Sequence, residues 1–241
     1  MQKVIGMAND TATGRARPGA KARLDPAMIV SAALDVASTS RSLQLSAKEL
    51  GARLDADPTA IYRHFRNKGH LMEALLDELN LRSVQAVTAT PEDWQTRLRQ
   101  MAAATLDQYC RHPSVAAEAM VLTTHGPGEQ AAVELMLDAF TRAGLPSHEV
   151  VRHYALLSSH VLSLASGIAR ARAAIPGSSS TDRTPWLEGP ILTDPRTHPR
   201  IAEFSAQLVN LEDRELFDLG IDSVIQSAEL IVAQQALEPQ P

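Results

Sequence analysis

Apolar residues recur every three or four positions along most of the chain, which is the spacing of one face of an α-helix. Such stripes predict helices over residues 26–37, 70–82, 92–111, 114–122, 129–143, 147–173 and 215–234. Ser147 is expected to cap the start of its helix, and Gly144 to end the preceding one. Residues 174–200 hold five prolines among glycine and serine, which predicts a loop. The pattern therefore favours an all-α fold.

Two more short helices, separated by a tight turn, are expected between Leu45 and Leu71. Ile61 and Phe65 are one helical turn apart and would point into a shared core. Asp57 followed by Pro58 is typical of an N-cap and the first helical residue, so the second helix should begin there. A helix, a short turn and a second helix form the motif that places its second helix in the DNA major groove.

The residues of this segment closely resemble the DNA-binding domain of the tetracycline-repressor (TetR) family of bacterial regulators. The resemblance is carried by Leu-Ser-Ala-Lys-Glu-Leu at 45–50, Ala-Ile-Tyr-Arg-His-Phe at 60–65 and Asn-Lys at 67–68. One position differs, because the family usually has glycine where this chain has Asp55, a residue type that tolerates the left-handed conformation. The resemblance implies an N-terminal three-helix helix-turn-helix DNA-binding domain and a C-terminal helical domain for ligand binding and dimerisation.

The charge of the chain is unevenly divided. Residues 1–70 carry 11 Lys and Arg against 6 Asp and Glu, whereas the remainder carries 12 against 22. The basic end is suited to phosphates and the acidic remainder is not. We therefore expect a basic arm at 1–23, a DNA-binding domain at 24–70 and an effector-binding and dimerisation domain at 71–241. The arm lacks apolar periodicity and is expected to be disordered alone; it either contacts DNA or remains a solvated tail.

Eight side chains are candidates for DNA contacts. Thr59, Ala60 and Arg63 would lie on the exposed side of the second helix, where they could reach base edges. Tyr62, His64 and Lys68 are expected to bind phosphates, Lys48 a base or a phosphate, and Ser46 to cap its helix while the backbone amides face a phosphate. The alternative for Tyr62 and His64 is a packing role, and for Lys68 an ordinary solvated lysine.

The resemblance also implies a small-molecule pocket in the second domain, whose filling moves the helix at 70–82. The candidate lining residues are Trp94, Tyr109, Met120, Leu122, His125, Met136, Phe140, His153 and His160, with Tyr154 and Arg170 as further polar candidates. His153 and His160 are too far apart on one helix to share a metal ion, and each could instead be a core or interface histidine. The position of the family's magnesium-binding histidine falls on Leu122. We therefore expect an apolar or amphipathic effector rather than tetracycline with magnesium.

Composition excludes several other classes of protein. No segment has 18 uninterrupted apolar residues and the N-terminus lacks a signal-peptide core, so a cytoplasmic protein without a membrane partner is expected. Cys110 is the single cysteine, which excludes an intrachain disulfide and a cysteine-rich metal site. The sequence contains no nucleophile elbow, phosphate-binding glycine loop, dinucleotide fingerprint or His-Glu-x-x-His motif. We therefore expect neither an enzyme nor a cofactor.

The two long helices at 147–173 and 215–234 have more apolar surface than a small monomer needs to cover. In the family that the chain resembles, the last two long helices form a four-helix bundle with a twin subunit, although they could instead complete a bundle within one chain. We expect a homodimer that binds double-stranded operator DNA and represses transcription until a small molecule releases it. The alternative is an effector-independent DNA-binding regulator or architectural protein.

Overall fold

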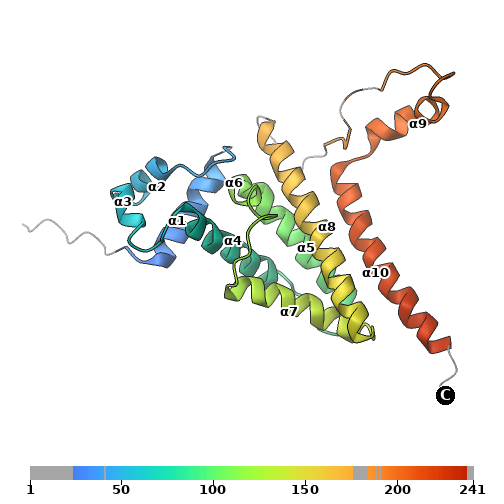
Figure 1. Ribbon diagram of the computed structural model, residues 1–241, viewed down its shortest axis with the longest axis horizontal. Coiled ribbons are helices and arrows are strands. Elements are labelled where there is room, and N and C mark those ends of the chain that lie inside the picture. The colour runs from blue at the N-terminus through green and yellow to red at the C-terminus, as the bar shows by residue number, and fades with distance from the viewer. Residues whose placement is uncertain (1–23, 41, 176–183, 188, 190, 238–241) are drawn as a thin grey trace, which may run out of the picture.

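A computed structural model of the protein describes residues 24–40, 42–175, 184–187, 189 and 191–237. In these residues the chain forms ten α-helices and no β-strand (Figure 1). The helices are α1 (Pro26–Thr39), α2 (Ala47–Arg53), α3 (Pro58–Ile61), α4 (Lys68–Gln85), α5 (Trp94–Arg111), α6 (Pro113–Ala116), α7 (Pro127–Arg142), α8 (Ser147–Ala174), α9 (Pro199–Asn210) and α10 (Asp213–Leu237).

The first three helices form a small head at one end of the molecule (Figure 1). Its core contains Ile29, Leu50, Ile61 and Phe65, each at most 4% exposed. Full burial of such a side chain contributes about 1.5–3 kcal/mol. Because the head has few residues, this small cluster must hold α2 and α3 at a fixed angle against α1.

Helix α4 connects the head to the rest of the molecule. It packs against α1 at its start and against α5 and α7 further along. Leu75 and Leu79, one turn apart, are fully buried. Asn67 caps the helix, since its side chain accepts a 2.8 Å hydrogen bond from the His70 N–H. A displacement of α4 would therefore move the head relative to the body.

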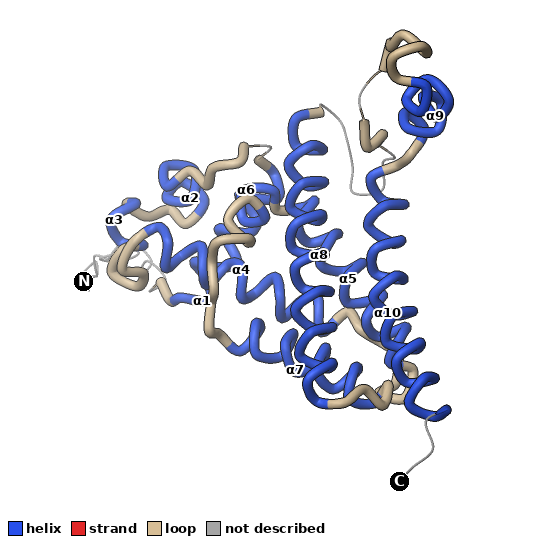
Figure 2. Tube along the Cα trace, turned by 45° about the vertical axis from the view of Figure 1, so that its right-hand side comes forward, coloured by secondary structure: helices blue, strands red, loops and turns tan. Residues whose placement is uncertain are grey.

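The body consists mainly of α5, α7, α8 and α10, and α8 and α10 lie side by side (Figure 2). A buried ion pair joins the end of α8 to the start of α10, with 3.0 Å between Arg172 Nη2 and Asp213 Oδ1. Thr184 donates a 2.7 Å hydrogen bond to the other oxygen of Asp213. These contacts fix the two long helices together where the chain leaves one and enters the other.

The helices expected from the sequence are present, with three differences. The helix expected at 114–122 is the shorter α6, which gives way to turns after Ala116. Ser147 does not cap α8, because the N-cap is Pro146 and no side chain caps it. Helix α9 was not predicted. Gly144 does end α7, with a φ of 91° that favours glycine. The arm at 1–23 and part of the loop at 174–200 lie outside the described residues.

Among the described helices, none combines the length and the apolar character that a membrane span requires.

Candidate DNA-binding face and effector cavity

The turn between α2 and α3 is built by residues that suit their backbone positions. Asp55 has a φ of 46°, the left-handed conformation expected for the position where the family usually has glycine. Asp57 caps α3 by accepting hydrogen bonds from the Thr59 N–H at 2.8 Å and the Thr59 hydroxyl at 2.6 Å. These two bonds lower the pKa of Asp57. A Cβ atom at Gly51 would lie 2.9 Å from the Ala56 carbonyl oxygen, so the close approach of α2 to the turn requires glycine there.

The candidate DNA-contacting residues come from three neighbouring elements. Lys48, Thr59, Tyr62, Arg63, His64 and Lys68 are exposed, while Ser46 and Ala60 are partly exposed. The regular helix α3 ends at Ile61, but its helical turn continues. The Arg63 N–H donates a 3.3 Å hydrogen bond to the Ala60 carbonyl oxygen, and the His64 N–H donates a 3.0 Å bond to that of Ile61. Ser46 caps α2 with a 3.3 Å bond from the Glu49 N–H. The exposure of Tyr62 and His64 favours a contact role over a packing role.

The residues that follow α3 hold the candidate DNA-contacting residues in place through side chains that pack against the head. Phe65 is buried, and its ring lies edge-on to His70 with 5.5 Å between the ring centroids. The His70 Nδ1 atom in turn accepts a 3.2 Å hydrogen bond from the Arg66 N–H. With the Asn67 cap, these contacts set the angle at which Lys68 and α4 follow α3.

A cavity lies within the body, between α4, α5, α7 and α8 and the segment that follows α6. It encloses about 720 Å³ of space free of protein atoms, part of it open to solvent. Its walls are mostly apolar: Leu76, Leu98, Met101, Ala102, Ala119, Leu122, Ala132, Val133, Met136, Leu157, Val161 and Leu162.

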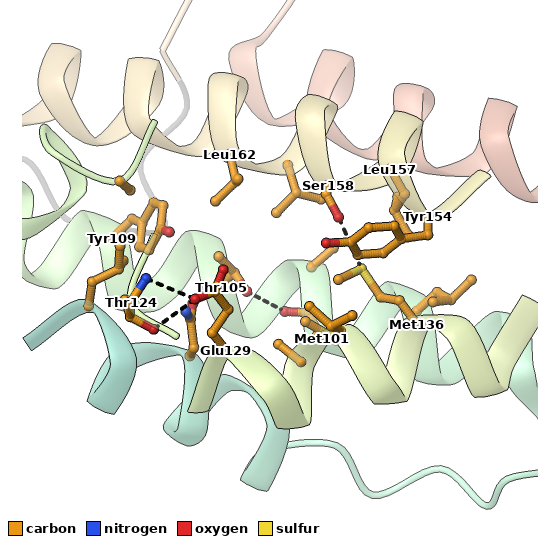
Figure 3. Close-up of a pocket in the computed structure, with 18 of the residues that line it drawn as sticks. Met101, Thr105, Tyr109, Thr124, Glu129, Met136, Tyr154, Leu157, Ser158 and Leu162 are labelled. Carbon is orange, nitrogen blue, oxygen red and sulfur yellow. Dashed lines mark hydrogen bonds between the residues drawn. The ribbon is translucent and has the colours of Figure 1, made fainter. Parts of the chain in front are cut away.

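Polar groups are gathered at the two ends of the cavity (Figure 3). Tyr109, Thr124 and Glu129 lie at one end, and Tyr154 and Ser158 at the other. Figure 3 shows the hydroxyl groups of the two tyrosines directed toward the middle of the cavity. The buried Tyr109 hydroxyl has no hydrogen-bond partner in the described part of the chain. An unpaired buried polar group costs about 1–3 kcal/mol.

The structure brings together only part of the predicted effector site. Tyr109, Leu122 and Met136 line the cavity, as does Tyr154. The other predicted lining residues, Trp94, Met120, His125, Phe140, His153 and His160, and the further candidate Arg170, do not.

Each of the excluded residues has another environment. The rings of Trp94, Phe140 and His153 contact one another in a row at tilted angles, with 6.3 Å and 5.6 Å between successive ring centroids. Met120 is 59% exposed, and His125 is also exposed. Arg170 is exposed on α8.

The two histidines of α8 contact α10. His153 Nε2 lies 3.2 Å from the Ser227 hydroxyl, and its Nδ1 lies 2.9 Å from the Glu149 carbonyl oxygen. His160 Nε2 lies 2.9 Å from the Phe217 carbonyl oxygen. Both side chains therefore act at the contact between the two long helices, which was the alternative interpretation of the sequence.

Several lining residues were missed from the sequence, above all Glu129, Thr124 and Asn80. Glu129 follows Gly126-Pro127-Gly128 and is the first residue of the helix expected at 129–143. In the structure its carboxylate accepts hydrogen bonds from the Thr124 and His125 N–H groups at 2.8 Å and 2.6 Å. The sequence feature that could have pointed to Glu129 is its position as an acidic residue in the first turn of a helix, where it can bind free backbone N–H groups.

The cavity is physically connected to α4. Leu76 and Asn80 of α4 form part of its wall. Asp77 between them accepts hydrogen bonds from the Gly128 and Glu129 N–H groups at 3.0 Å and 2.9 Å, and from the Thr124 hydroxyl at 2.8 Å. The helix that leads to the head is thus bonded to two residues that line the cavity.

Comparison with known proteins agrees with this arrangement. A family model described as the tetracycline-repressor-like C-terminal domain matches residues 88–226, more than half of the chain. The chain belongs to the TetR family. It is a DNA-binding transcriptional regulator of the helix-turn-helix type, and the family comprises regulators rather than enzymes.

Individual relatives resemble this TetR-family regulator over nearly its whole length. It is 27% identical to the transcriptional repressor DrrR1 of Streptomyces coeruleorubidus, over 95% of this chain and 86% of that protein. It is 24% identical to the transcriptional repressor Rv1353c of Mycobacterium tuberculosis, over 94% and 88% of the two chains. The fold matches that of apo ActR from Streptomyces coelicolor with a TM-score of 0.71 and 19% identity, over 90% of this chain and all of ActR.

Proposed function

We propose that the protein is a homodimeric repressor that leaves its operator when an amphipathic small molecule fills the cavity. The main support for this proposal is the position of α4. The helix begins at Lys68, one of the candidate DNA-contacting residues, and its residues Leu76 and Asn80 line the cavity. A molecule in the cavity would press on α4 or on the loop bonded to Asp77. Because α4 packs against α1, either change would alter the orientation of the head relative to the body.

Two relatives support repression rather than activation. DrrR1 and Rv1353c are named repressors. ActR, whose fold is shared at a TM-score of 0.69 in that structure, is known in complex with actinorhodin. A repressor that a ligand releases is the simplest regulator with these properties.

The outer faces of α8 and α10 support dimerisation. On α8, Leu156 is 54% exposed, and nothing lies within 4 Å of a Cβ atom placed at Gly167. On α10, Leu219 and Leu230 are 57% and 63% exposed. A twin subunit would cover these faces and hold two heads at a fixed separation, so that they read half-sites about 34–36 Å apart.

The proposed function can be tested by selecting a bound duplex and then screening for its release. The duplex would be selected from random double-stranded DNA by the full-length protein, and binding should weaken steeply as salt rises. A metabolite panel should contain compounds that release this duplex. Failure to select a sequence would contradict operator binding, and unchanged affinity across the panel would favour the effector-independent alternative.

A cavity-filling variant distinguishes these outcomes further. Ala132 lines the cavity, whereas its neighbour Ala131 does not. Ala132→Phe should therefore keep DNA binding and lose release by the compounds found in the screen. Ala131→Phe is the matched control and should respond as the parent protein does. Release of the Ala132→Phe variant at parental concentrations would exclude this cavity as the effector site.

A further inference from the structure

The Tyr109 end of the cavity contains a polar group that the described protein does not satisfy. The Tyr109 hydroxyl is buried, lines the cavity and has no hydrogen-bond partner in the described chain. Burial raises the pKa of Tyr109, so the phenol stays neutral and its oxygen can accept a hydrogen bond as well as donate one. Figure 3 shows this hydroxyl directed into the cavity. A bound molecule would supply the missing partner.

The Glu129 carboxylate forms the wall at the same end. All of its hydrogen bonds in the described chain reach Oε2: from the Thr124 N–H at 2.8 Å, the Thr124 hydroxyl at 3.0 Å and the His125 N–H at 2.6 Å. The second oxygen, Oε1, accepts none of them. One oxygen therefore holds the loop, and the other is left for a ligand.

A second carboxylate adds to the negative charge at this end. Asp77 and Glu129 both lie within hydrogen-bond distance of the Thr124 hydroxyl, at 2.8 Å and 3.0 Å. That hydroxyl has one proton and can donate it to only one carboxylate at a time.

Two arginines of the neighbouring helices are paired with other carboxylates. Arg82 of α4 pairs with Glu78, and Arg97 of α5 pairs with Asp138. In the described chain, no lysine or arginine forms an ion pair with Asp77 or Glu129. The two carboxylates thus have hydrogen-bond donors but no cationic side-chain partner in the described chain, and they lie beside an apolar cavity.

We propose that the effector is an amphipathic amine. Its apolar body would fill the middle of the cavity, and its protonated amino group would lie against Glu129 Oε1, with the Tyr109 oxygen accepting a further hydrogen bond from it. A cation beside a partly buried carboxylate is stabilised more strongly than in water, and an anion of the same shape is repelled. The inference rests on the proposed function, since it takes the cavity to be the effector site.

Three probes of one shape separate charge from apolar fit. They are 9-(aminomethyl)anthracene, which is protonated at neutral pH, the neutral 9-anthracenemethanol and the anionic 9-anthracenecarboxylate. Binding to the full-length protein without DNA is measured by the change in anthracene fluorescence. We expect the amine to bind about tenfold more tightly than the alcohol, and the carboxylate to bind most weakly.

Variants then assign the preference to this end of the cavity. Glu129→Gln keeps an oxygen that can accept from the loop but removes the charge, so it should abolish the preference for the amine over the alcohol. Tyr109→Phe should weaken binding of the amine severalfold. Glu134→Gln, exposed on the same helix as Glu129 and outside the cavity, should leave the preference unchanged. Thermal unfolding of each variant confirms that it is folded.

Four outcomes would each overturn the inference. They are equal binding of the amine and the alcohol, tightest binding of the carboxylate, no saturable binding of the amine, and an unchanged preference for the amine in Glu129→Gln. These outcomes are distinguishable from failure of the proposed function. The probe measurements use no DNA, whereas the proposed function is judged by operator binding and release.

Discussion

The backbone N–H of Gly128 donates a 3.0 Å hydrogen bond to the Asp77 side chain, which ties the first turn of α7 to the middle of α4. The N-cap of α7, Gly126, has no side chain to cap the helix. Asp77 takes over that role from a neighbouring helix, and its negative charge suits a helix N-terminus. A Cβ atom at residue 128 would overlap the Asp77 carbonyl oxygen. The two helices therefore meet more closely here than any residue but glycine allows.

This close approach predicts that Gly128→Ala destabilises the protein. The added methyl group would push α7 away from α4 and lengthen the hydrogen bonds to Asp77. We expect the free energy of unfolding in urea to fall by about 1–3 kcal/mol. Glu134→Ala, exposed on the same helix, should change it by less than about 0.5 kcal/mol. A Gly128→Ala variant as stable as the parent would show that the contact between α4 and α7 is not tight.

The DNA-contacting face predicts two different losses of affinity. Arg63→Ala should relax the preference at particular bases and cost about 1–3 kcal/mol on the preferred duplex, because an arginine reads guanine through two hydrogen bonds. Lys68→Ala should weaken binding to all sequences alike and reduce the salt slope by about one. Binding isotherms on specific and random duplexes at several salt concentrations distinguish the two effects.

The control for both variants is Arg111→Ala, an exposed arginine at the end of α5. It removes the same charge as Arg63→Ala but lies outside the proposed DNA face, so its affinity and salt slope should match the parent protein. If Arg63→Ala and Lys68→Ala also bound as the parent does, this face would not be the one that meets DNA.

The head was predictable because its signals are local. The Asp57 cap and the Asp55 turn each depend on residues within a few positions, and both are present as expected. Helix α9 has similar local features, with Pro199 in its first turn and apolar residues at 201, 204 and 208. It was missed because the prolines before it favour a loop.

The cavity was not predictable to the same degree, because its wall forms only when four helices and a loop pack together. Trp94 and Phe140 have the right chemistry for a ligand, but their rings pack against each other at a tilted angle. His160 was ambiguous because its partner, the Phe217 carbonyl oxygen, is 57 residues away in the sequence. Periodicity shows which face of a helix is apolar, but not whether that face meets a cavity or another helix.

The outer face of α8 predicts that a large residue there prevents dimerisation. Gly167→Arg would place a long cation where the proposed twin helix packs, while the monomer has open space at that position. We expect the molar mass from light scattering to change from that of a dimer to that of a monomer, and the affinity for the operator to fall. Gln130→Arg, exposed on α7, is the matched control and should remain dimeric. A dimeric Gly167→Arg variant, or a monomeric parent protein, would contradict this interface.

Burial of His112 predicts a loss of stability in mild acid. The side chain is 5% exposed, and its Nδ1 atom lies 2.8 Å from the Gln108 carbonyl oxygen. Burial lowers the pKa of His112 in the folded protein. The unfolded chain takes up a proton near the ordinary histidine value of about 6.5, whereas the folded protein does not. The unfolded state therefore binds more protons as pH falls below that value, and stability decreases until the lowered pKa is reached.

Thermal unfolding between pH 7.5 and pH 5.5 tests this effect of His112. The melting temperature of the parent protein should fall across this interval, and the fall should be smaller in His112→Asn, whose amide can still donate to Gln108 but does not titrate. His125→Asn replaces an exposed histidine and should keep the parental pH dependence. Because both variants remove one histidine, they change the overall charge equally. A His112→Asn profile parallel to that of the parent would show that the folded protein protonates this residue as readily as the unfolded chain does.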